Sequence, residues 1–179
     1  MEEYLDVLDA QGNLTGQKKL RSEVHKDEDW HRLAFVWIMN SHGELLIQKR
    51  SMGKDANPGR WDASCGGHVI AGGTSLATAI KELKEELGIT TSESQLEYLF
   101  STKEQPESNT EKQFVDVFLL RSDTPLSQLK LQKEEIDEVR YLPWREVENL
   151  ILKKDDTFAP RYNQYKELFK LLRSRSGNT

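Results

Sequence analysis

The sequence predicts one mixed α/β (α+β) domain that spans residues 1–179, and three observations point to this class. Short apolar runs bounded by turn residues predict several β-strands, and the run at 33–39 is the most apolar of them. Apolar residues at helical spacing predict three helices, at about 75–87, 144–152 and 161–173. With 179 residues, of which 36% are hydrophobic, the chain can bury a core of its own.

Strands and helices follow one another in an irregular order. The first half reads as two hairpins around a polar stretch at 21–25, with strands expected at 4–8, 14–19, 33–39 and 45–48. The second half has further strands, expected at 96–102, 113–121 and 138–142, before the last two helices. We expect the polar segment 103–111 to border a site, and residues 173–179 to form a frayed tail.

Composition narrows the classes of partner. A net charge of -5 and a pI near 5.5 disfavour a polymeric nucleic acid or an anionic membrane as partner. The single cysteine, Cys65, excludes an intramolecular disulfide, and the acidic start of the chain lacks the features of a signal peptide. We therefore expect a cytoplasmic protein that acts on a small molecule. The oligomeric state stays open, with a homodimer among the alternatives.

The predicted helix at 75–87 carries an acidic face. Glu82, Glu85 and Glu86 are neighbours on one face, and apolar residues occupy the opposite stripe: Leu76, Ile80, Leu83 and Leu87. Like charges four positions apart weaken a helix by a few tenths of a kcal/mol, roughly, so a cation offers compensation. Carboxylate oxygens suit Mg²⁺ or Mn²⁺. The alternative is a solvated face that Lys81 and Lys84 help to neutralise.

The same stretch resembles the signature of the Nudix hydrolases, Gx5Ex7REUxEExGU, in which U is a bulky aliphatic residue. Seven positions are in frame: Gly67, Glu82, Leu83, Glu85, Glu86, Gly88 and Ile89. Two positions depart, because Gly73 replaces the first Glu and Lys81 replaces the Arg. The resemblance implies the Nudix fold, a mixed β-sheet sandwiched between α-helices. It also implies hydrolysis of a diphosphate with Mg²⁺ or Mn²⁺ as cofactor.

Cationic residues precede this helix in the sequence. Lys49, Arg50 and Lys54 lie within six positions, and cations beside a carboxylate-metal site are what a diphosphate requires. Gly66 and Gly67 permit a close approach of the backbone to the same substrate. We predict that these five residues bind substrate, although a solvated basic loop would have the same composition.

Within the superfamily the chain most resembles the isopentenyl-diphosphate isomerase-like branch, through the segment QKRSMGKDANPGRWDASCGGH. The isomerases place a cysteine two residues before a histidine and use a downstream glutamate. Here these positions are Gly66 and Gln113, and Cys65 lies one residue too early, so its side chain should point elsewhere. Isomerase activity is therefore the second alternative. A non-catalytic nucleotide-binding Nudix domain is another, favoured slightly by Gly73 and Lys81.

Three histidines resemble the metal-binding histidines of the isomerases. They are His25, His31 and His68, with Glu111 near an acidic ligand position, so a second cation site is an expectation of the resemblance. Imidazoles favour Zn²⁺ or Mn²⁺ over Mg²⁺. The alternative is that all three are ordinary hydrogen-bonded polar residues.

The expected mechanism is metal-dependent cleavage of the P–O–P link in a nucleoside diphosphate derivative or a related small molecule. Glu82, Glu85 and Glu86 would hold the cation, which lowers the pKa of a water molecule. Glu82 or Glu135 would act as the base, and Glu85 is essential to the site. Because Lys81 is a flexible point charge where the family has a rigid Arg fork, the hydrolysis is expected to be slow.

Overall fold

The computed structural model describes residues 2–105, 111–153 and 157–177. Two strands, β1 (Tyr4–Leu8) and β2 (Leu14–Leu20), form a small antiparallel sheet. The described residues also contain a seven-stranded sheet, made of β3 (His31–Met39), β4 (Glu44–Arg50), β5 (Trp61–Asp62), β6 (Cys65–His68), β7 (Leu96–Glu104), β8 (Gln113–Arg121) and β9 (Ile136–Pro143). The helices are α1 (Arg21–Lys26), α2 (Ser75–Leu87), α3 (Trp144–Leu152) and α4 (Tyr162–Ser176), with short 3-10 turns at Glu93–Gln95 and Leu126–Gln128.

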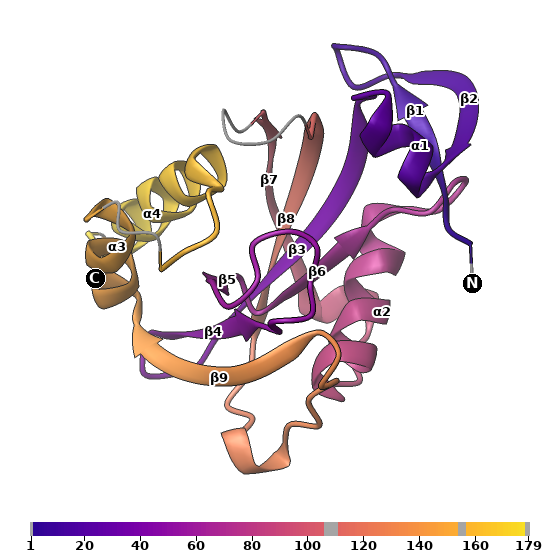
Figure 1. Cartoon of the computed structure of the whole chain (residues 1–179). Helices are drawn as coiled ribbons and strands as arrows, with labels where there is room; N and C mark the ends of the chain where they lie inside the picture. The colour runs from indigo at the N-terminus through magenta and orange to yellow at the C-terminus, as the bar shows by residue number, and fades with distance from the viewer. Residues whose placement is uncertain (1, 106–110, 154–156, 178–179) are drawn as a thin grey trace.

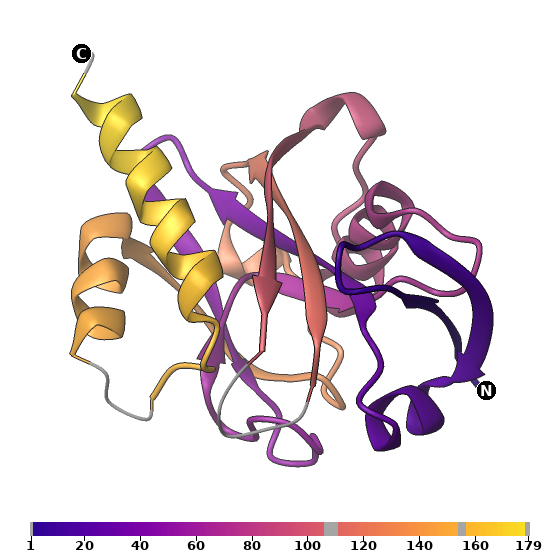
Figure 2. The ribbon, with the colours of Figure 1, turned by 90° about the horizontal axis from the view of Figure 1, so that it is seen from above.

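The large sheet is mixed, as expected. Its main order is β5-β4-β3-β8-β7, in which β3 and β8 run parallel and the other neighbours antiparallel. Figures 1 and 2 show α2 on one side of the sheet and α3 with α4 on the other. The predicted fold class, a mixed sheet between helices, is therefore confirmed. Within the described residues, no helix is both long and apolar enough to cross a bilayer.

Strand β3 supplies both hydrophobic cores, because successive side chains point to opposite faces of a sheet. Leu33, Phe35 and Trp37 belong to the core under α3 and α4. The alternate positions belong to the core under α2, together with Leu83 and Leu87 of that helix: Ala34, Val36 and Ile38. An apolar run without alternation, as in 33–39, is typical of a strand buried on both faces.

One edge of β3 is shared by two strands. Strand β3 pairs with β4 only at Ile38 and Met39, and with β6 from Leu33 to Val36. Strands β4 and β6 therefore leave the same edge in different directions. The sheet opens between them, and one pocket there is lined from both faces, by Phe35 on the side of α3 and α4 and by Glu82 of α2 on the other.

Helix α2 has the predicted bounds. The Thr74 side chain accepts the N–H of Ala77, and Gly88 ends the helix at a φ of 72°, which glycine adopts without strain. Leu83 and Leu87 are fully buried, as the apolar stripe predicts. Glu86 is buried as well, with an exposed fraction of 3%, so this member of the acidic face is not solvated.

Three local features were not predicted or differ from the expectation. The polar stretch at 21–25 is part of helix α1, in which Glu23 accepts the N–H of Leu20 and Val24 is buried. The expected tail is helical as far as Ser176, and Arg175 pairs with Glu97 of β7. Strands β5 and β6 were not predicted, because two and four residues are too few for a periodic signal. Part of the expected loop at 103–111, residues 106–110, lies outside the described residues.

Candidate active site

A polar cleft of about 260 Å³ lies where the sheet opens. Helix α2 contributes Glu82, Glu85 and Glu86 to its wall, and the turn before β9 contributes Glu135. We call these four residues the carboxylate cluster. The structure therefore brings together all four acidic residues that the sequence analysis assigned to catalysis and to the first metal.

Two adjacent glycines let the carboxylate cluster approach β6. A Cβ at Gly67 would lie 2.6 Å from Oε1 of Glu82, so a side chain at this position would displace the Glu82 carboxylate. The N–H of Gly66 donates a hydrogen bond to the carboxylate of Glu86, and Nε2 of Gln48 lies 3.4 Å from Oε2 of the same group. Both glycines thus act through their missing side chains and their backbone, at the edge of the cleft.

The carboxylate cluster holds more negative charge than its neighbours balance. Burial raises the pKa of Glu86 well above its ordinary value of 4.5, and the charges of Glu82 and Glu135 raise it further. Burial raises the pKa of Glu82 too, although Lys81 opposes this shift. A divalent cation is the kind of partner that would remove this imbalance, because hard cations prefer carboxylate oxygens. The residues present therefore fit the metal that the resemblance implies.

Cationic side chains line the same cleft. Nζ of Lys54 lies 2.5 Å from Oε2 of Glu135, and Nζ of Lys81 lies 3.3 Å from Glu82 and 3.2 Å from Glu85. Arg50 also lines the cleft, with Nε bonded to the carbonyl of Ala56. Burial alone would lower the pKa of Lys81, but attraction to Glu82 and Glu85 outweighs it, and the pKa is raised.

Lys49 is not brought to the cleft. It lies on β4 between Gln48, which contacts Glu86, and Arg50, which lines the cleft. Because side chains alternate along a strand, that of Lys49 points to the opposite face. Proximity in sequence suggested one basic cluster, but the strand divides it.

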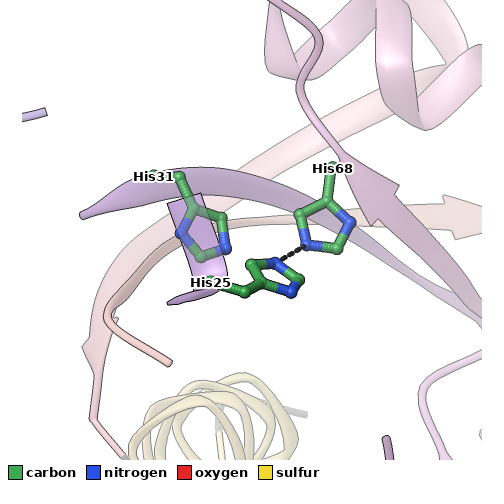
Figure 3. A group of neighbouring side chains, drawn as sticks. All are labelled: His25, His31 and His68. Carbon is green, nitrogen blue, oxygen red and sulfur yellow. Dashed lines mark hydrogen bonds between the residues drawn. The ribbon is translucent and has the colours of Figure 1, made fainter. Parts of the chain in front are cut away.

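The three histidines converge from α1, β3 and β6, and we call His25, His31 and His68 the histidine cluster (Figure 3). One ring nitrogen from each lies within 4.8 Å of the others. Nε2 of His25 is 3.2 Å from Nε2 of His68, and Nδ1 of His25 is 3.8 Å from Glu111. Nδ1 of His31 is bonded to the carbonyl of Asp29, while its buried Nε2 has no partner among the described residues.

Burial keeps the histidine cluster neutral. It lowers the pKa of His31 to about 4 and that of His68 well below its ordinary value of 6.5, and it lowers the pKa of His25 as well. Neutral imidazoles are the form that binds metals. The unpartnered Nε2 of His31 and the close spacing therefore fit a cation of the softer type.

The positions expected to distinguish an isomerase are unsuited to proton transfer. Cys65 is fully buried in the core under α2, where burial raises the pKa of its thiol well above 9.0. The thiol points away from the cleft, as predicted from its position one residue too early. Gln113 lines the cleft and donates a hydrogen bond of 2.6 Å to Glu111.

Sequence reasoning missed three charged residues that line the cleft, Glu3, Arg21 and Arg161, and Arg161 is the most buried of them. Arg161 precedes α4 and lines the cleft next to Phe35, whose ring centroid lies 4.2 Å from the guanidinium carbon. In the sequence it stands only at the start of an amphipathic helix, some 75 positions after the acidic helix. No local pattern marks it, because its partners come from other strands.

Comparison with known proteins places this cleft in a family. The model of the NUDIX domain matches residues 29–168, which include α2, the carboxylate cluster and two members of the histidine cluster. The chain belongs to the Nudix family. Over 97% of its length it is 40% identical to Nudix hydrolase 3 of Arabidopsis thaliana, and it spans only 24% of that longer protein.

Other Nudix relatives match along their whole length. A Nudix hydrolase of Listeria monocytogenes is 36% identical, with 96% of this chain and 95% of the relative covered. The crystal structure of DR0079 from Deinococcus radiodurans superposes with a TM-score of 0.72 at 25% identity, covering 92% of this chain and 98% of the other. An isopentenyl-diphosphate isomerase of Serratia proteamaculans is 38% identical over 49% of each chain. These relatives identify a Nudix hydrolase with ties to the isomerase-like branch.

Proposed function

We propose that the cleft hydrolyses a P–O–P linkage in a nucleoside diphosphate derivative or a related small molecule, with Mg²⁺ or Mn²⁺. The observation that carries the proposal is the convergence of four carboxylates beside Arg50, Lys54 and Lys81 in one cleft. A site for a diphosphate needs both signs of charge, because the cation and the phosphate oxygens must each be balanced. A solvated acidic face would not bury Glu86 or raise its pKa.

The roles of the residues follow from their positions. Glu82, Glu85 and Glu86 would hold the cation, which when bound neutralises phosphate charge and lowers the pKa of a water molecule. Arg50 and Lys54 are placed to bind phosphate oxygens. We propose that Gly66 and Gly67, which line the cleft, bind substrate through their backbone, because Phe35 and Glu82 occupy the space that side chains there would fill.

Two carboxylates are candidates for the base that takes the proton from water. Burial raises the pKa of Glu82, and a base is more effective when its pKa approaches the working pH. Glu135 would have to give up its 2.5 Å ion pair with Lys54 when it accepts a proton. We therefore assign the base to Glu82 and propose that Glu135 orients Lys54.

The histidine cluster supports a second proposal, a site for Zn²⁺ or Mn²⁺ formed by His25, His31 and His68, with Glu111 next to it. Its support is the unpartnered Nε2 of His31 and ring nitrogens within 4.8 Å of one another. Isomerase activity lacks comparable support, because Gly66 and Gln113 cannot exchange protons as a thiol and a carboxylate do. We also propose that residues 1–179 form one domain.

A substrate screen tests the function. Nucleoside diphosphate derivatives, dinucleotides, coenzymes and prenyl diphosphates are incubated with Mg²⁺ or Mn²⁺, and phosphate release and double-bond migration are scored together. We expect phosphorus–oxygen cleavage in at least one class and double-bond migration in none. Metal-binding protein that turns over none of these compounds would contradict the proposal, and migration without cleavage would favour the isomerase.

A further inference from the structure

Arg161 is a largely buried charged residue of the cleft that the proposed hydrolysis does not use. Its side chain is 12% exposed, and it reaches the cleft from the start of α4. A buried guanidinium requires compensating partners, since it loses most of its hydration. The contacts around Arg161 therefore indicate which of its donors are already satisfied and which remain for a ligand.

Asp62 of β5 holds one edge of the guanidinium. Nε of Arg161 lies 3.0 Å from both carboxylate oxygens of Asp62, which is fully buried. The donors on Nη1 and Nη2 of Arg161 have no hydrogen-bond partner in the part of the chain that the structure describes. These paired nitrogens are the ones that bind a phosphate or carboxylate in bidentate fashion. Asp62 thus fixes the guanidinium and leaves its terminal donors available.

Phe35 supports the flat face of the same guanidinium, 4.2 Å from the ring centroid. Phe35 is paired in register with Gly66, and a Cβ at Gly66 would lie only 2.5 Å from Cδ1 of the ring. Gly66 therefore makes room for the ring under Arg161. Gly66, which stands where the isomerases have a cysteine, therefore also allows Phe35 to support Arg161.

The cleft consequently has two chemically different ends. The carboxylate cluster comes mainly from α2, while Arg161 comes from the side of the sheet that α3 and α4 cover (Figure 1). Asp62 lies between the two ends, because Nη1 of Arg50 is 3.8 Å from the carboxylate that pairs with Arg161. Arg50 and Arg161 therefore flank the same carboxylate, so a group attached to a diphosphate at Arg50 lies within reach of Arg161.

We infer that Arg161 binds an anionic group, a phosphate or a carboxylate, that the substrate carries outside its scissile diphosphate. This inference rests on the proposed hydrolysis and names the class of substrate. Arg161 is then a specificity-determining residue. An apolar group at this end would displace water from the guanidinium and would not replace the hydrogen bonds that the water accepts. Substrates with an apolar tail, such as prenyl diphosphates, are disfavoured for the same reason.

Matched substrate pairs test the inference. UDP-glucose and UDP-glucuronate differ by a carboxylate, and ADP-ribose and its 2′-phosphate differ by a phosphate, so the two pairs separate the two anions. We expect kcat/KM to be about 10- to 100-fold higher for the charged member of at least one pair, the range expected for hydrogen bonds to a charged group. In Arg161→Gln this preference should disappear, so that the charged and uncharged members of a pair have the same kcat/KM.

Control variants separate recognition from folding. Arg161→Lys keeps the positive charge next to Asp62 but lacks the paired terminal nitrogens of a guanidinium. It should therefore lose part of the preference for the charged substrate. Arg32→Gln is the matched control, because Arg32 forms a similar ion pair with Asp116, 2.9 Å long, and does not line the cleft. It should keep the full preference. Thermal unfolding shows whether each variant is folded. If Arg161→Gln does not fold, the substrate preference of Arg161→Lys decides the outcome.

Equal kcat/KM values for both members of both pairs would overturn the inference, as would an equal loss on both members in Arg161→Gln. Absence of cleavage of every diphosphate would instead contradict the proposed hydrolysis. Calorimetric binding of the same pairs to metal-free protein then decides the inference separately. Tighter binding of a charged member, lost in Arg161→Gln, supports it, and equal binding refutes it.

Discussion

The carboxylate cluster and the histidine cluster each contain buried side chains, yet burial shifts their pKa values in opposite directions. It raises the pKa values of Glu82 and Glu86, and it lowers those of His25, His31 and His68. In each case the neutral form is favoured, because the charged form loses hydration. Neutral imidazoles are already able to bind a metal, whereas a protonated carboxyl must first release its proton.

This difference predicts that the two proposed metal sites respond differently to a cation. The histidine cluster is preorganised and gains little charge compensation from a cation. The carboxylate cluster is strained electrostatically without one, so cation binding there should be coupled to proton release and to stability. Four changes, from the largest expected effect to the smallest, test whether the two clusters differ in this way.

The first change separates the clusters by activity. Glu85→Gln should lower kcat/KM for diphosphate hydrolysis by about a thousandfold, because it removes a ligand of the catalytic cation. The fold should persist, since the Glu85 side chain is half exposed. His68→Asn, which alters the other cluster, should lower Mg²⁺-dependent hydrolysis by less than about tenfold. Equal activity of Glu85→Gln and the unchanged protein would favour a non-catalytic nucleotide-binding domain.

The second change concerns the response of the histidine cluster to pH. The pKa of His31 is about 4 in the folded protein and 6.5 ordinarily, so the unfolded chain binds more protons between these values. The contribution of neutral His31 to the free energy of unfolding is therefore complete above pH 6.5, and it is lost as the pH falls to about 4. At about 1.4 kcal/mol per pKa unit, the loss amounts to about 3 kcal/mol.

His31→Asn should remove the share of this loss that His31 contributes and leave the shares of His25 and His68, as measured by urea unfolding of the metal-free protein at a series of pH values. His42→Asn is the control, because His42 is exposed in a turn outside the cluster. If His31→Asn and the unchanged protein lose the same stability over this range, burial does not keep His31 neutral.

The third change concerns the carboxylate cluster, for which the dependence of stability on pH has the opposite sign. Because the pKa of Glu86 is raised above 4.5, the folded protein binds more protons than the unfolded chain, and stability falls as the pH rises through the raised value. Metal-free Glu86→Gln should therefore be more stable at pH 7, by about 1.4 kcal/mol for each unit of the shift. With Mg²⁺ at about 100 times its Kd, the unchanged protein should gain about 2.7 kcal/mol.

Chemical unfolding with and without Mg²⁺ measures both effects. The order of stability of the two proteins should reverse when Mg²⁺ is added, because Glu86→Gln lacks a full set of charged ligands. A lower stability of Glu86→Gln without metal would mean that the charge of Glu86 is already balanced within the protein.

The fourth change is the smallest and tests the departure from the family signature. Lys81 already contacts both Glu82 and Glu85, although its charge is a single point. Lys81→Arg should change kcat/KM by less than about threefold, since partly exposed ion pairs contribute about 1 kcal/mol or less. Steady-state kinetics on the best substrate of the screen measures this. A gain of about a hundredfold would show that Lys81 limits the rate.

Several features followed from the sequence because they depend on local spacing. Glu82, Glu85 and Glu86 share a helix face at any position in a fold, and Thr74 and Gly88 end the helix through contacts within a few residues. Their spacing with Gly67 sufficed to predict the family and the fold. The early position of Cys65 also predicted that its thiol would be absent from the cleft.

Only the tertiary structure decided the arrangement of groups that are distant in the chain. The burial of Glu86, the convergence of the histidine cluster and the position of Arg161 all depend on how β3, β4 and β6 diverge at one edge. Strand alternation removed Lys49 from the cleft for the same reason. Such contacts depend on strand register and on packing between distant segments, and the periodicity of a short stretch of sequence does not predict either.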